Sequence, residues 1–237
     1  MPTFSAGGRI VATALSLTLL VASAACSGDD ATQESPTALL DRAETTLDQT
    51  SSVHFTLTST DVSQTGSRLL GGEGIAARPT AFQGKLDVLV NGGKVSIEIV
   101  SVAGKVYAKL PFQSTFAVAD PKTLGLSDPA LLIDPETGLS RLVSELTDAK
   151  TVGEARIDGE VVSEIQGKVP GQVVADVFTS ADPGKPVETT AYIVRDSGEL
   201  RRAVLKGPFF DKGRDSTFTL VLNQYGAKVA ISAPPVG

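Results

Sequence analysis

The chain of 237 residues has one cysteine, one histidine and one methionine, and it has no tryptophan. One cysteine cannot form a disulfide within the chain. One cysteine with one histidine cannot supply the ligands of a zinc site or the attachment of a c-type haem. Most metal and redox chemistry is therefore excluded, and the sequence predicts that the protein binds no cofactor and no metal ion.

Positive charge is also scarce, because 21 Lys and Arg residues stand against 27 Asp and Glu residues and give a net charge of −6. Binding to nucleic acid needs clustered positive charge on the protein, so we expect no nucleic-acid partner. Hydrophobic residues make up 41% of the chain and charged residues 20%, which is typical of a folded globular domain.

The motifs of the common catalytic sites are missing. No Gly-x-Ser-x-Gly elbow and no His-Glu-x-x-His site occurs, and the sole imidazole, His54, is expected on the polar face of a strand. The run Gly71-Gly72-Glu73-Gly74 lacks the Lys-Ser/Thr of a phosphate-binding loop and predicts a turn. Two carboxylates can meet in any fold, so an envelope hydrolase stays as a weaker alternative, but the sequence favours a protein that is not an enzyme.

The first 25 residues have the pattern of a signal peptide. Arg9 precedes an apolar run from Ile10 to Ala22, and the small residues Ser23-Ala24-Ala25 end the pattern directly before Cys26. The apolar run is too short for a comfortable transmembrane helix, and the polar residues that follow carry no Lys or Arg. Residues 1–25 are therefore predicted to be removed on export.

Cys26 stands where the bacterial lipobox has its acylated cysteine, although Ser23 replaces the usual aliphatic residue. The alternative is a stray cysteine in an ordinary signal peptide. Several acyl chains on one cysteine hold a protein firmly on a membrane. We expect Cys26 to be lipidated and residues 26–35, which are small and polar, to form a flexible tether. The protein would then be anchored at the outer face of the cell membrane, with a partly released form as an alternative.

Residues 36–237 are predicted to form one α+β domain. Ser35 and Pro36 mark a helix start, and apolar residues follow at helical spacing: Leu39, Leu40, Ala43 and Leu47. Three stretches then alternate in hydrophobicity, at 53–57, 82–90 and 95–99. Hairpin signals at Asn91-Gly92-Gly93 and at Ala103-Gly104 predict an antiparallel sheet.

A helical block interrupts the strands. Asp128-Pro129 and Asp134-Pro135 both predict helix starts, and Leu139, Leu142, Val143 and Leu146 then fall on one helical face. Further strands are expected at 150–157, 160–169, 188–195, 199–206 and 216–223, and a short helix at 171–178. The sheet dominates, so the helices are expected to cover one of its faces.

The composition of that sheet leaves its interior undecided. The chain has 25 valines against 12 aromatic residues, so small branched side chains line the inward face. Such a sheet could enclose an apolar cavity, or it could form an ordinary close-packed core, which is the better interpretation from composition alone.

Several segments resemble one family of mycobacterial lipoproteins. They are the signal peptide ending at Cys26, Ser52-Val53-His54-Phe55, the block 84–90, the run from Asp134 to Leu139 continuing to 148–150, and the C-terminal residues 222–229 with Pro234-Pro235. Together they look like the LppX/LprA/LprF/LprG family, nearest its LprG branch. The resemblance implies a half-barrel similar to LolA and LolB, a strongly curved antiparallel sheet with helices on its concave face and an apolar cavity.

The resemblance also implies a function. Family members hold acylated envelope lipids, and the LprG branch is associated with triacylated glycolipids such as phosphatidylinositol mannosides and lipoarabinomannan, and with triacylglycerol. That branch is linked to an efflux transporter of the major facilitator class. We therefore expect a monomeric, membrane-anchored lipid carrier with these partners.

The inward-facing aliphatic residues are the candidates for the cavity wall. The set is Leu86, Val88, Val90, Val95, Ile97, Ile99, Val106, Ala108, Leu142, Val143 and Leu146. Each of them could equally belong to an ordinary core. A second hypothesis is a scaffold or adaptor for the transporter with no carrier role, in which the loop 179–186 or the segment Gly207-Pro-Phe-Phe-Asp211 presents a docking surface.

Overall fold

The computed structural model describes residues 34–63, 65–124 and 127–237. The predicted signal peptide and Cys26 lie outside the described residues. The helices are α1 (Pro36–Gln49), α2 (Leu139–Ser144) and α3 (Gly171–Val177), with two short 3-10 helices, η1 (Pro121–Leu124) and η2 (Pro129–Ile133). The strands are β1 (Ser52–Thr60), β2 (Arg68–Ala77), β3 (Ala81–Val90), β4 (Gly93–Val102), β5 (Lys105–Lys109), β6 (Ala117–Ala119), β7 (Thr147–Ile157), β8 (Glu160–Val169), β9 (Val187–Val194), β10 (Leu200–Asp211) and β11 (Arg214–Asn223).

All these strands belong to one antiparallel sheet. Their order is β6-β5-β4-β3-β2-β1-β11-β10-β9-β8-β7, so the sheet is open, with β6 and β7 at its edges. Strands that follow one another in the chain pair with each other, except β6 and β7, which lie at opposite edges. At the centre β1 also pairs with β11, in a register that sets Phe55 opposite Leu222. The predicted α+β class with an antiparallel sheet is confirmed.

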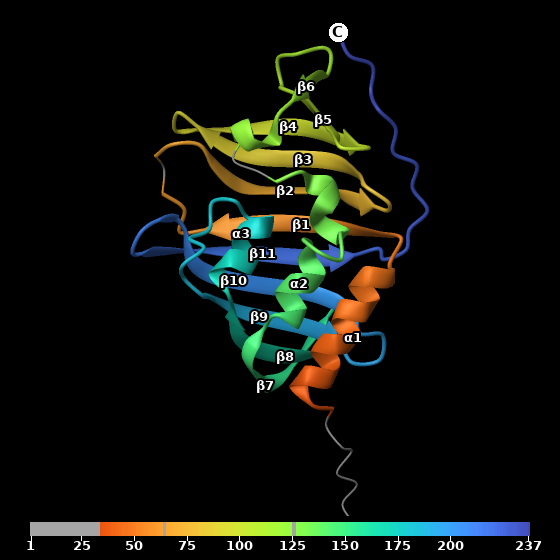
Figure 1. The fold of residues 1–237 in the computed structure, drawn as a ribbon, viewed down its shortest axis with the longest axis vertical. Helices are drawn as coiled ribbons and strands as arrows, with labels where there is room; N and C mark the ends of the chain where they lie inside the picture. The colour runs from red at the N-terminus through yellow and green to blue at the C-terminus, as the bar shows by residue number, and fades with distance from the viewer. Residues whose placement is uncertain (1–33, 64, 125–126) are drawn as a thin grey trace, which may run out of the picture. The chain divides into compact units, whose positions relative to one another are not determined.

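The helices cover one face of this curved sheet (Figure 1). Side chains alternate between the two faces of a strand, so Val53, Phe55 and Leu57 of β1 all point under the helices and are buried. His54 points to the other face, as predicted, and its Nδ1 lies 3.0 Å from Oδ1 of Asn223. The helices therefore lie on the concave side of a half-barrel.

The helix predicted at the start of the domain is confirmed. Ser35 is its N-cap and accepts a hydrogen bond from the backbone N–H of Ala38, and Pro36 is its first residue. Both predicted hairpin turns are also present, since Gly92 and Gly104 have φ angles of 79° and 74°, a region that favours glycine.

The prediction of a turn at Gly71-Gly72-Glu73-Gly74 is wrong, because this run lies inside β2. Its glycines are needed for close approach between strands. A Cβ atom on Gly74 would lie 2.7 Å from the carbonyl oxygen of Gln83 and 2.8 Å from the ring of Phe82. Glycine in a strand often marks such an approach, and composition alone made it look like a turn.

The predicted helix around Leu142 is shorter than expected. Asp134-Pro135 does not begin a helix. Oδ1 of Asp134 instead accepts hydrogen bonds from the backbone N–H groups of Glu136 and Thr137, each at 3.0 Å, and so stabilises a turn. The helix α2 begins only at Leu139 and ends at Ser144. The other start signal, Asp128-Pro129, begins the 3-10 helix η2, with Asp128 as its N-cap.

After β11 the chain runs past the ends of the strands to the β6 edge of the sheet (Figure 1). Ser52 donates a hydrogen bond from Oγ to the carbonyl of Ala227 at 2.7 Å, and Val236 forms a bridge with Phe116 beside β6. The C-terminal segment thus connects the centre of the sheet to its β6 edge.

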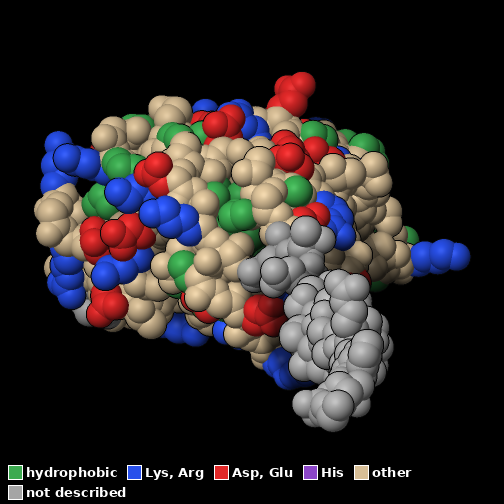
Figure 2. All heavy atoms as spheres, turned by 90° about the horizontal axis from the view of Figure 1, so that it is seen from below, with side chains coloured by type: hydrophobic (Ala, Val, Ile, Leu, Met, Phe, Trp, Pro, Cys, Tyr) green, Lys and Arg blue, Asp and Glu red, His purple; other side chains and the backbone are tan. Residues whose placement is uncertain are grey.

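Opposite charges are interspersed on the outer surface. On the face that Figure 2 shows, acidic and basic side chains alternate over short distances, with hydrophobic side chains among them. Arg195 pairs with Glu154 at 2.5 Å, and Arg201 pairs with Glu160 at 2.5 Å. Ion pairs at a surface each contribute about 1 kcal/mol at most, so the fold relies on its core.

Candidate functional site

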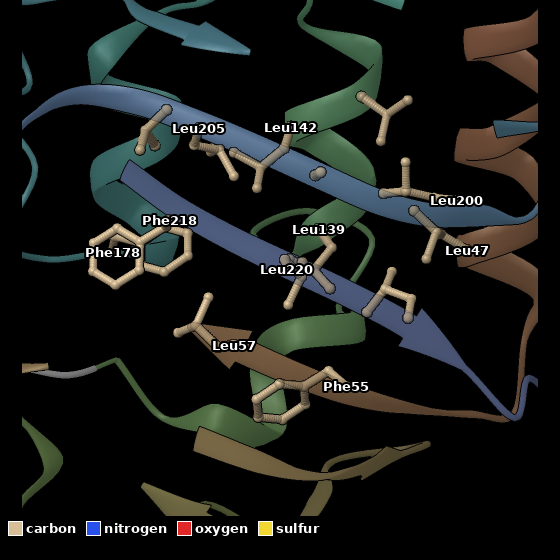
Figure 3. Close-up of a cluster of buried hydrophobic side chains, with 14 of the residues drawn as sticks. Leu47, Phe55, Leu57, Leu139, Leu142, Phe178, Leu200, Leu205, Phe218 and Leu220 are labelled. Carbon is tan, nitrogen blue, oxygen red and sulfur yellow. The ribbon is translucent and has the colours of Figure 1, made fainter. Parts of the chain in front are cut away.

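Buried side chains from both layers fill the space between the sheet and the helices (Figure 3). Leu47 of α1, Leu142 of α2 and Phe178 after α3 point toward the sheet, where Leu200 of β10 and Leu220 of β11 face them. Alternation within the strands and helical spacing in α1 place these residues on the inner faces. The result is one continuous apolar cluster.

Aromatic rings fill one end of this cluster. The ring of Phe218 lies 5.0 Å from that of Phe178 and 4.7 Å from that of Phe209, in stacked and edge-on contacts respectively. All three side chains are buried. Such contacts are typical of a well-packed core and add to the stability that burial gives.

An apolar pocket of about 60 Å³ lies in the middle of the cluster. Its floor is formed by β1, β2, β3 and β11, and its cover by η2, the start of α2 and the end of α3. Eleven of its fifteen lining residues are apolar: Phe55, Leu57, Leu69, Leu86, Pro129, Leu131, Leu132, Leu139, Val177, Phe178 and Leu220. A space of this kind favours hydrocarbon over polar groups.

The pocket is small in this structure. A cavity needs on the order of 10–15 Å³ of such space for one water molecule, so this one has room for only a few small groups. Both interpretations left open by the composition therefore apply in part. Most of the interior is close-packed, and an apolar pocket lies within it.

Four polar residues form the rim of the pocket, namely Ser127, Asp128, Thr137 and Asp176. Thr137 and Asp176 are exposed and the other two are half-buried, whereas the floor residues are buried except for Leu69, which is half-buried. Ser127 donates a hydrogen bond from Oγ to the backbone carbonyl of Asp176 at 2.9 Å. This bond joins the segment before η2 to α3.

Ten of the eleven residues predicted for the cavity wall lie in or against the concave-face cluster. Leu86 lines the pocket itself. The other buried members are Val88, Ile97, Ile99, Val106, Leu142, Val143 and Leu146, and Val95 and Ala108 are partly buried against them. Val90 is 39% exposed at the end of β3. The structure thus brings one predicted residue to the pocket and places nine around it.

Sequence reasoning did not select most of the residues that line the pocket. Alternation along 53–57 places Phe55 and Leu57 on one face of a strand, but only the pairing of β1 with β11 places them at the centre of the sheet. Leu131 and Leu132 belong to η2, whose signal was the apolar run after Asp128-Pro129. That run could have indicated a cover over the sheet.

The segment Gly207-Pro-Phe-Phe-Asp211 was a candidate docking surface in the second hypothesis, with a place in the core or at a mouth as the alternative. It belongs to β10, and Phe209 is fully buried. Phe210 is half-buried and packs under the guanidinium of Arg68, 4.9 Å from its ring centre. Flanking Pro and Gly suggested exposed aromatic side chains, but Phe209 belongs to the core, as the alternative had it.

Two features are absent from the residues that the structure describes, a metal site and a membrane-spanning helix. Across residues 34–63, 65–124 and 127–237 there is no group of three or more His, Cys, Asp or Glu side chains placed to hold a metal ion. Within the same ranges no helix has both the length and the apolar character needed to cross a bilayer.

Comparison with known proteins identifies relatives of this chain. It is 30% identical over 164 residues to the lipoarabinomannan carrier protein LprG of Mycobacterium tuberculosis, a match that covers 68% of this chain and 66% of that protein, just under two thirds of its length. It is 30% identical over 234 residues to the LprG of Mycolicibacterium hassiacum, covering 94% and 97%.

A solved structure has the same fold. The crystal structure of LprF from Mycobacterium bovis matches with a TM-score of 0.72 at 20% identity, covering 85% of this chain and 97% of that one. The family model described as LppX_LprAFG lipoprotein matches residues 35–231. This chain therefore belongs to the LppX/LprA/LprF/LprG lipoprotein family.

Proposed function

We propose that this protein is a membrane-anchored carrier that binds the acyl chains of envelope lipids under η2 and α3 and transfers the lipids between membranes. The observation that carries this proposal is the apolar pocket on the concave face, lined by eleven apolar residues and bordered by polar ones. The naming of relatives as lipoarabinomannan carriers supports it. The function involves no chemical step.

The physical need for such a carrier is large. Each methylene that an acyl chain exposes to water costs about 0.8 kcal/mol, so the spontaneous transfer of a lipid with several chains is very slow. A pocket lined by leucine, phenylalanine and valine replaces water around the chains. Smooth aliphatic walls bind chains without selecting one position, and this permits release.

The pocket must enlarge to hold an acyl chain. Ligand pockets in proteins usually measure about 300–1,000 Å³, far above the 60 Å³ of the pocket in this structure. The cover over the pocket is suited to move, because η2 and α3 have five and seven residues and short helices are marginally stable by themselves. The bond from Ser127 to the carbonyl of Asp176 would break as they separate.

The finer points of the proposal rest on the resemblance of the sequence to the family. The cargo would be a triacylated glycolipid, such as a phosphatidylinositol mannoside or lipoarabinomannan, or triacylglycerol. Acylation of Cys26 would hold the monomer at the outer face of the cell membrane, and a major-facilitator efflux transporter would be its partner.

Native mass spectrometry with lipid extraction tests the carrier role. The protein with Cys26→Ser, purified from an actinobacterial host without detergent, is expected to carry a stoichiometric lipid with several acyl chains. Leu86→Trp places a large ring in the pocket and is expected to abolish lipid binding with the fold retained. Val90→Trp is the matched control, because Val90 lies on the same strand, is 39% exposed and does not line the pocket.

The results separate the carrier from the scaffold. Lipid lost in Leu86→Trp and kept in Val90→Trp supports the carrier. A protein that is folded and empty in every preparation contradicts it and favours the adaptor hypothesis. Retention of lipid by Leu86→Trp would show that the chains bind elsewhere.

A further inference from the structure

The loop between β5 and β6 carries an exposed apolar surface. Phe112 of this loop is 83% exposed and Val118 of β6 is 67% exposed, the two highest values among the large hydrophobic side chains of the described residues. Val236, which is 56% exposed, forms a bridge with Phe116 of the same loop. Apolar side chains that gather on a surface indicate a contact with another body. We call residues 110–119 the β6 tip.

The β6 tip carries no charged side chain. Residues 110–119 include no Lys, Arg, Asp or Glu, although such residues make up 20% of the chain. Edge strands usually carry charged side chains that keep other strands away, and β6 at the edge of the sheet has none of its own. Lysines instead flank the tip, namely Lys105, Lys109 and Lys122. Asp120 is the sole acidic residue between the first and the last of them, so the flanks are basic on a chain of net charge −6.

The flanking lysines have two kinds of environment. Nζ of Lys109 lies 3.0 Å from Oε2 of Glu98 and 5.3 Å from the centre of the Phe116 ring, so its charge is already paired. Lys105 and Lys122 are exposed, and their side chains can reach an external anion. Bilayers with anionic lipids attract such lysines, and aromatic and aliphatic side chains enter the boundary between head groups and acyl chains.

We propose that the β6 tip is a membrane-contact site, at which Phe112 inserts into a lipid bilayer while Lys105 and Lys122 lie against anionic head groups. The small area of the tip favours a bilayer over a protein partner. An aromatic side chain buries about 150–250 Å², whereas a standard protein interface buries about 800 Å² on each partner. A bilayer needs no such area, because a single side chain can enter between its head groups.

The β6 tip lies at the edge of the sheet far from the expected tether. The sheet ends in β6 at one edge and in β7 at the other, and α1, where the tether joins the domain, packs against β7 and β9 (Figure 1). Eleven strands about 4.8 Å apart give a sheet about 50 Å wide along its curve. Leu110, at the start of the tip, packs against the concave-face cluster. A domain held at one membrane by its tether can therefore present the tip to a second membrane.

A single tryptophan can report the insertion, because the chain has none of its own. The Cys26→Ser protein with Phe112→Trp is mixed with vesicles of phosphatidylcholine and phosphatidylglycerol. We expect its emission to shift to shorter wavelength, and lipids brominated on their acyl chains to quench it, since the indole ring leaves water. Val152→Trp is the matched control, because Val152 is 51% exposed on β7 at the other edge. Its emission is expected to stay unchanged.

Two further variants measure the contributions of the ring and of the lysines by vesicle co-sedimentation. Phe112→Ser is expected to lower the partition of the protein onto the same vesicles about tenfold, as the loss of one buried aromatic side chain predicts. Circular dichroism should show an unchanged fold, since Phe112 is exposed. Lys105→Gln with Lys122→Gln is expected to lower the partition about fivefold on these vesicles, and to change it little on phosphatidylcholine alone.

Three results would overturn the inference. Emission of Phe112→Trp that vesicles leave unchanged would refute insertion and would leave the tip as a surface for a protein partner. An equal shift in Val152→Trp would show that the protein binds vesicles without a preferred site. Unchanged partition of Phe112→Ser would show that this ring does not hold the protein on the bilayer. None of these results depends on lipid in the pocket, so the carrier function is tested separately.

Discussion

The two halves of the sheet, on either side of the seam between β1 and β11, are covered differently. Over β7 to β11 lie α1 and α2, and the rings of Phe178, Phe209 and Phe218 close the space at one end. Over β2 to β4 lies η2, with five residues. On this side Gly72 and Gly74 of β2 put no side chain under the cover.

This difference explains where the pocket forms. A long amphipathic helix places an apolar side chain on its inner face at every turn, and these side chains fill the layer beneath it. Leu47 of α1 is one of them. The five-residue 3-10 helix η2 places fewer side chains over β2 to β4. The apolar pocket lies at the seam, between the closed half and the thinly covered half.

Leucine-to-alanine variants in the closed half and in the thinly covered half should show the largest effect on the free energy of unfolding. Leu205 of β10 is fully buried in the closed half, and Leu86 of β3 borders the pocket. Leu→Ala in a core costs about 2–5 kcal/mol, and the cost rises with the volume of the cavity it leaves. We expect Leu205→Ala near the upper end of this range and Leu86→Ala near the lower end, because Leu86 already lacks neighbours on its pocket side. Urea unfolding with circular dichroism measures both.

Lipid uptake adds a second measurement on the same pair. Leu86→Ala enlarges the pocket and is expected to keep its lipid, in contrast to Leu86→Trp. Leu205→Ala, which lies away from the pocket lining, should bind lipid as the parent protein does wherever it remains folded. Equal losses of stability at the two positions would mean that the two halves are packed alike.

The sequence predicted the closed half well because its signals are local. Ser35 and Pro36 mark the start of α1, and alternation along 216–223 marks β11, and both elements are present. Hydrophobic period and capping act within a few residues, so they can be recognised without knowledge of the fold. The position of β1 beside β11 could not be predicted in this way, because it depends on pairing between the two ends of the chain.

The pocket was harder to predict, because its lining depends on which helix covers a strand and on how closely neighbouring strands approach each other. Alternation along the strand predicted that Leu86 faces inward. The same alternation predicted this for Val90, whose side chain is 39% exposed. A strand face extends to the end of the strand, but η2 covers only part of it. Gly74 looked like a turn residue, and its role became clear only from the ring of Phe82 beside it. The family resemblance predicted the half-barrel without specifying which residues border the space.

Alkaline pH should weaken the closed half through Tyr225, with a smaller effect than the leucine variants. The hydroxyl of Tyr225 donates to the carbonyl of Leu200 at 2.8 Å. Burial raises the pKa of Tyr225 well above its usual range, and the negative charge of Glu199 adds to this shift. A raised folded-state pKa gives stability that is complete below the unfolded-state pKa of about 10 and is lost as pH rises above it.

Tyr225→Phe tests this effect. The variant should lose about 1 kcal/mol at neutral pH, because the hydrogen bond to Leu200 is gone. It should also lose less stability than the parent protein between about pH 10 and 11. Part of the alkaline loss remains in the variant, since burial and the charge of Glu164 raise the pKa of Tyr192 as well. Identical alkaline profiles from urea unfolding would contradict the role of Tyr225.

The smallest expected effect is a loss of stability at acid pH in the thinly covered half. Asp87 of β3 lies on the outer face, where Nζ of Lys94 is 2.8 Å from its Oδ2 and Ser96 donates a hydrogen bond to its Oδ1. Partial burial alone would raise the pKa of Asp87, but the hydrogen bonds from Lys94 and Ser96, with the charge of Lys94, outweigh it and lower the pKa. The stability this gives is therefore present above about pH 4 and is lost as pH falls below it.

Asp87→Asn should cost about 1 kcal/mol or less at pH 7, because the ion pair is at the surface, and the difference from the parent protein should vanish in acid. Urea unfolding at several pH values measures it, and Ser96→Ala is the control that removes one hydrogen bond and leaves the pair with Lys94. A difference that stays constant down to low pH would mean that packing of the side chain, rather than its charge, stabilises this strand. Loss of lipid in Asp87→Asn would contradict the separation of the two faces, since Asp87 lies on the side of β3 opposite to Leu86 and the pocket.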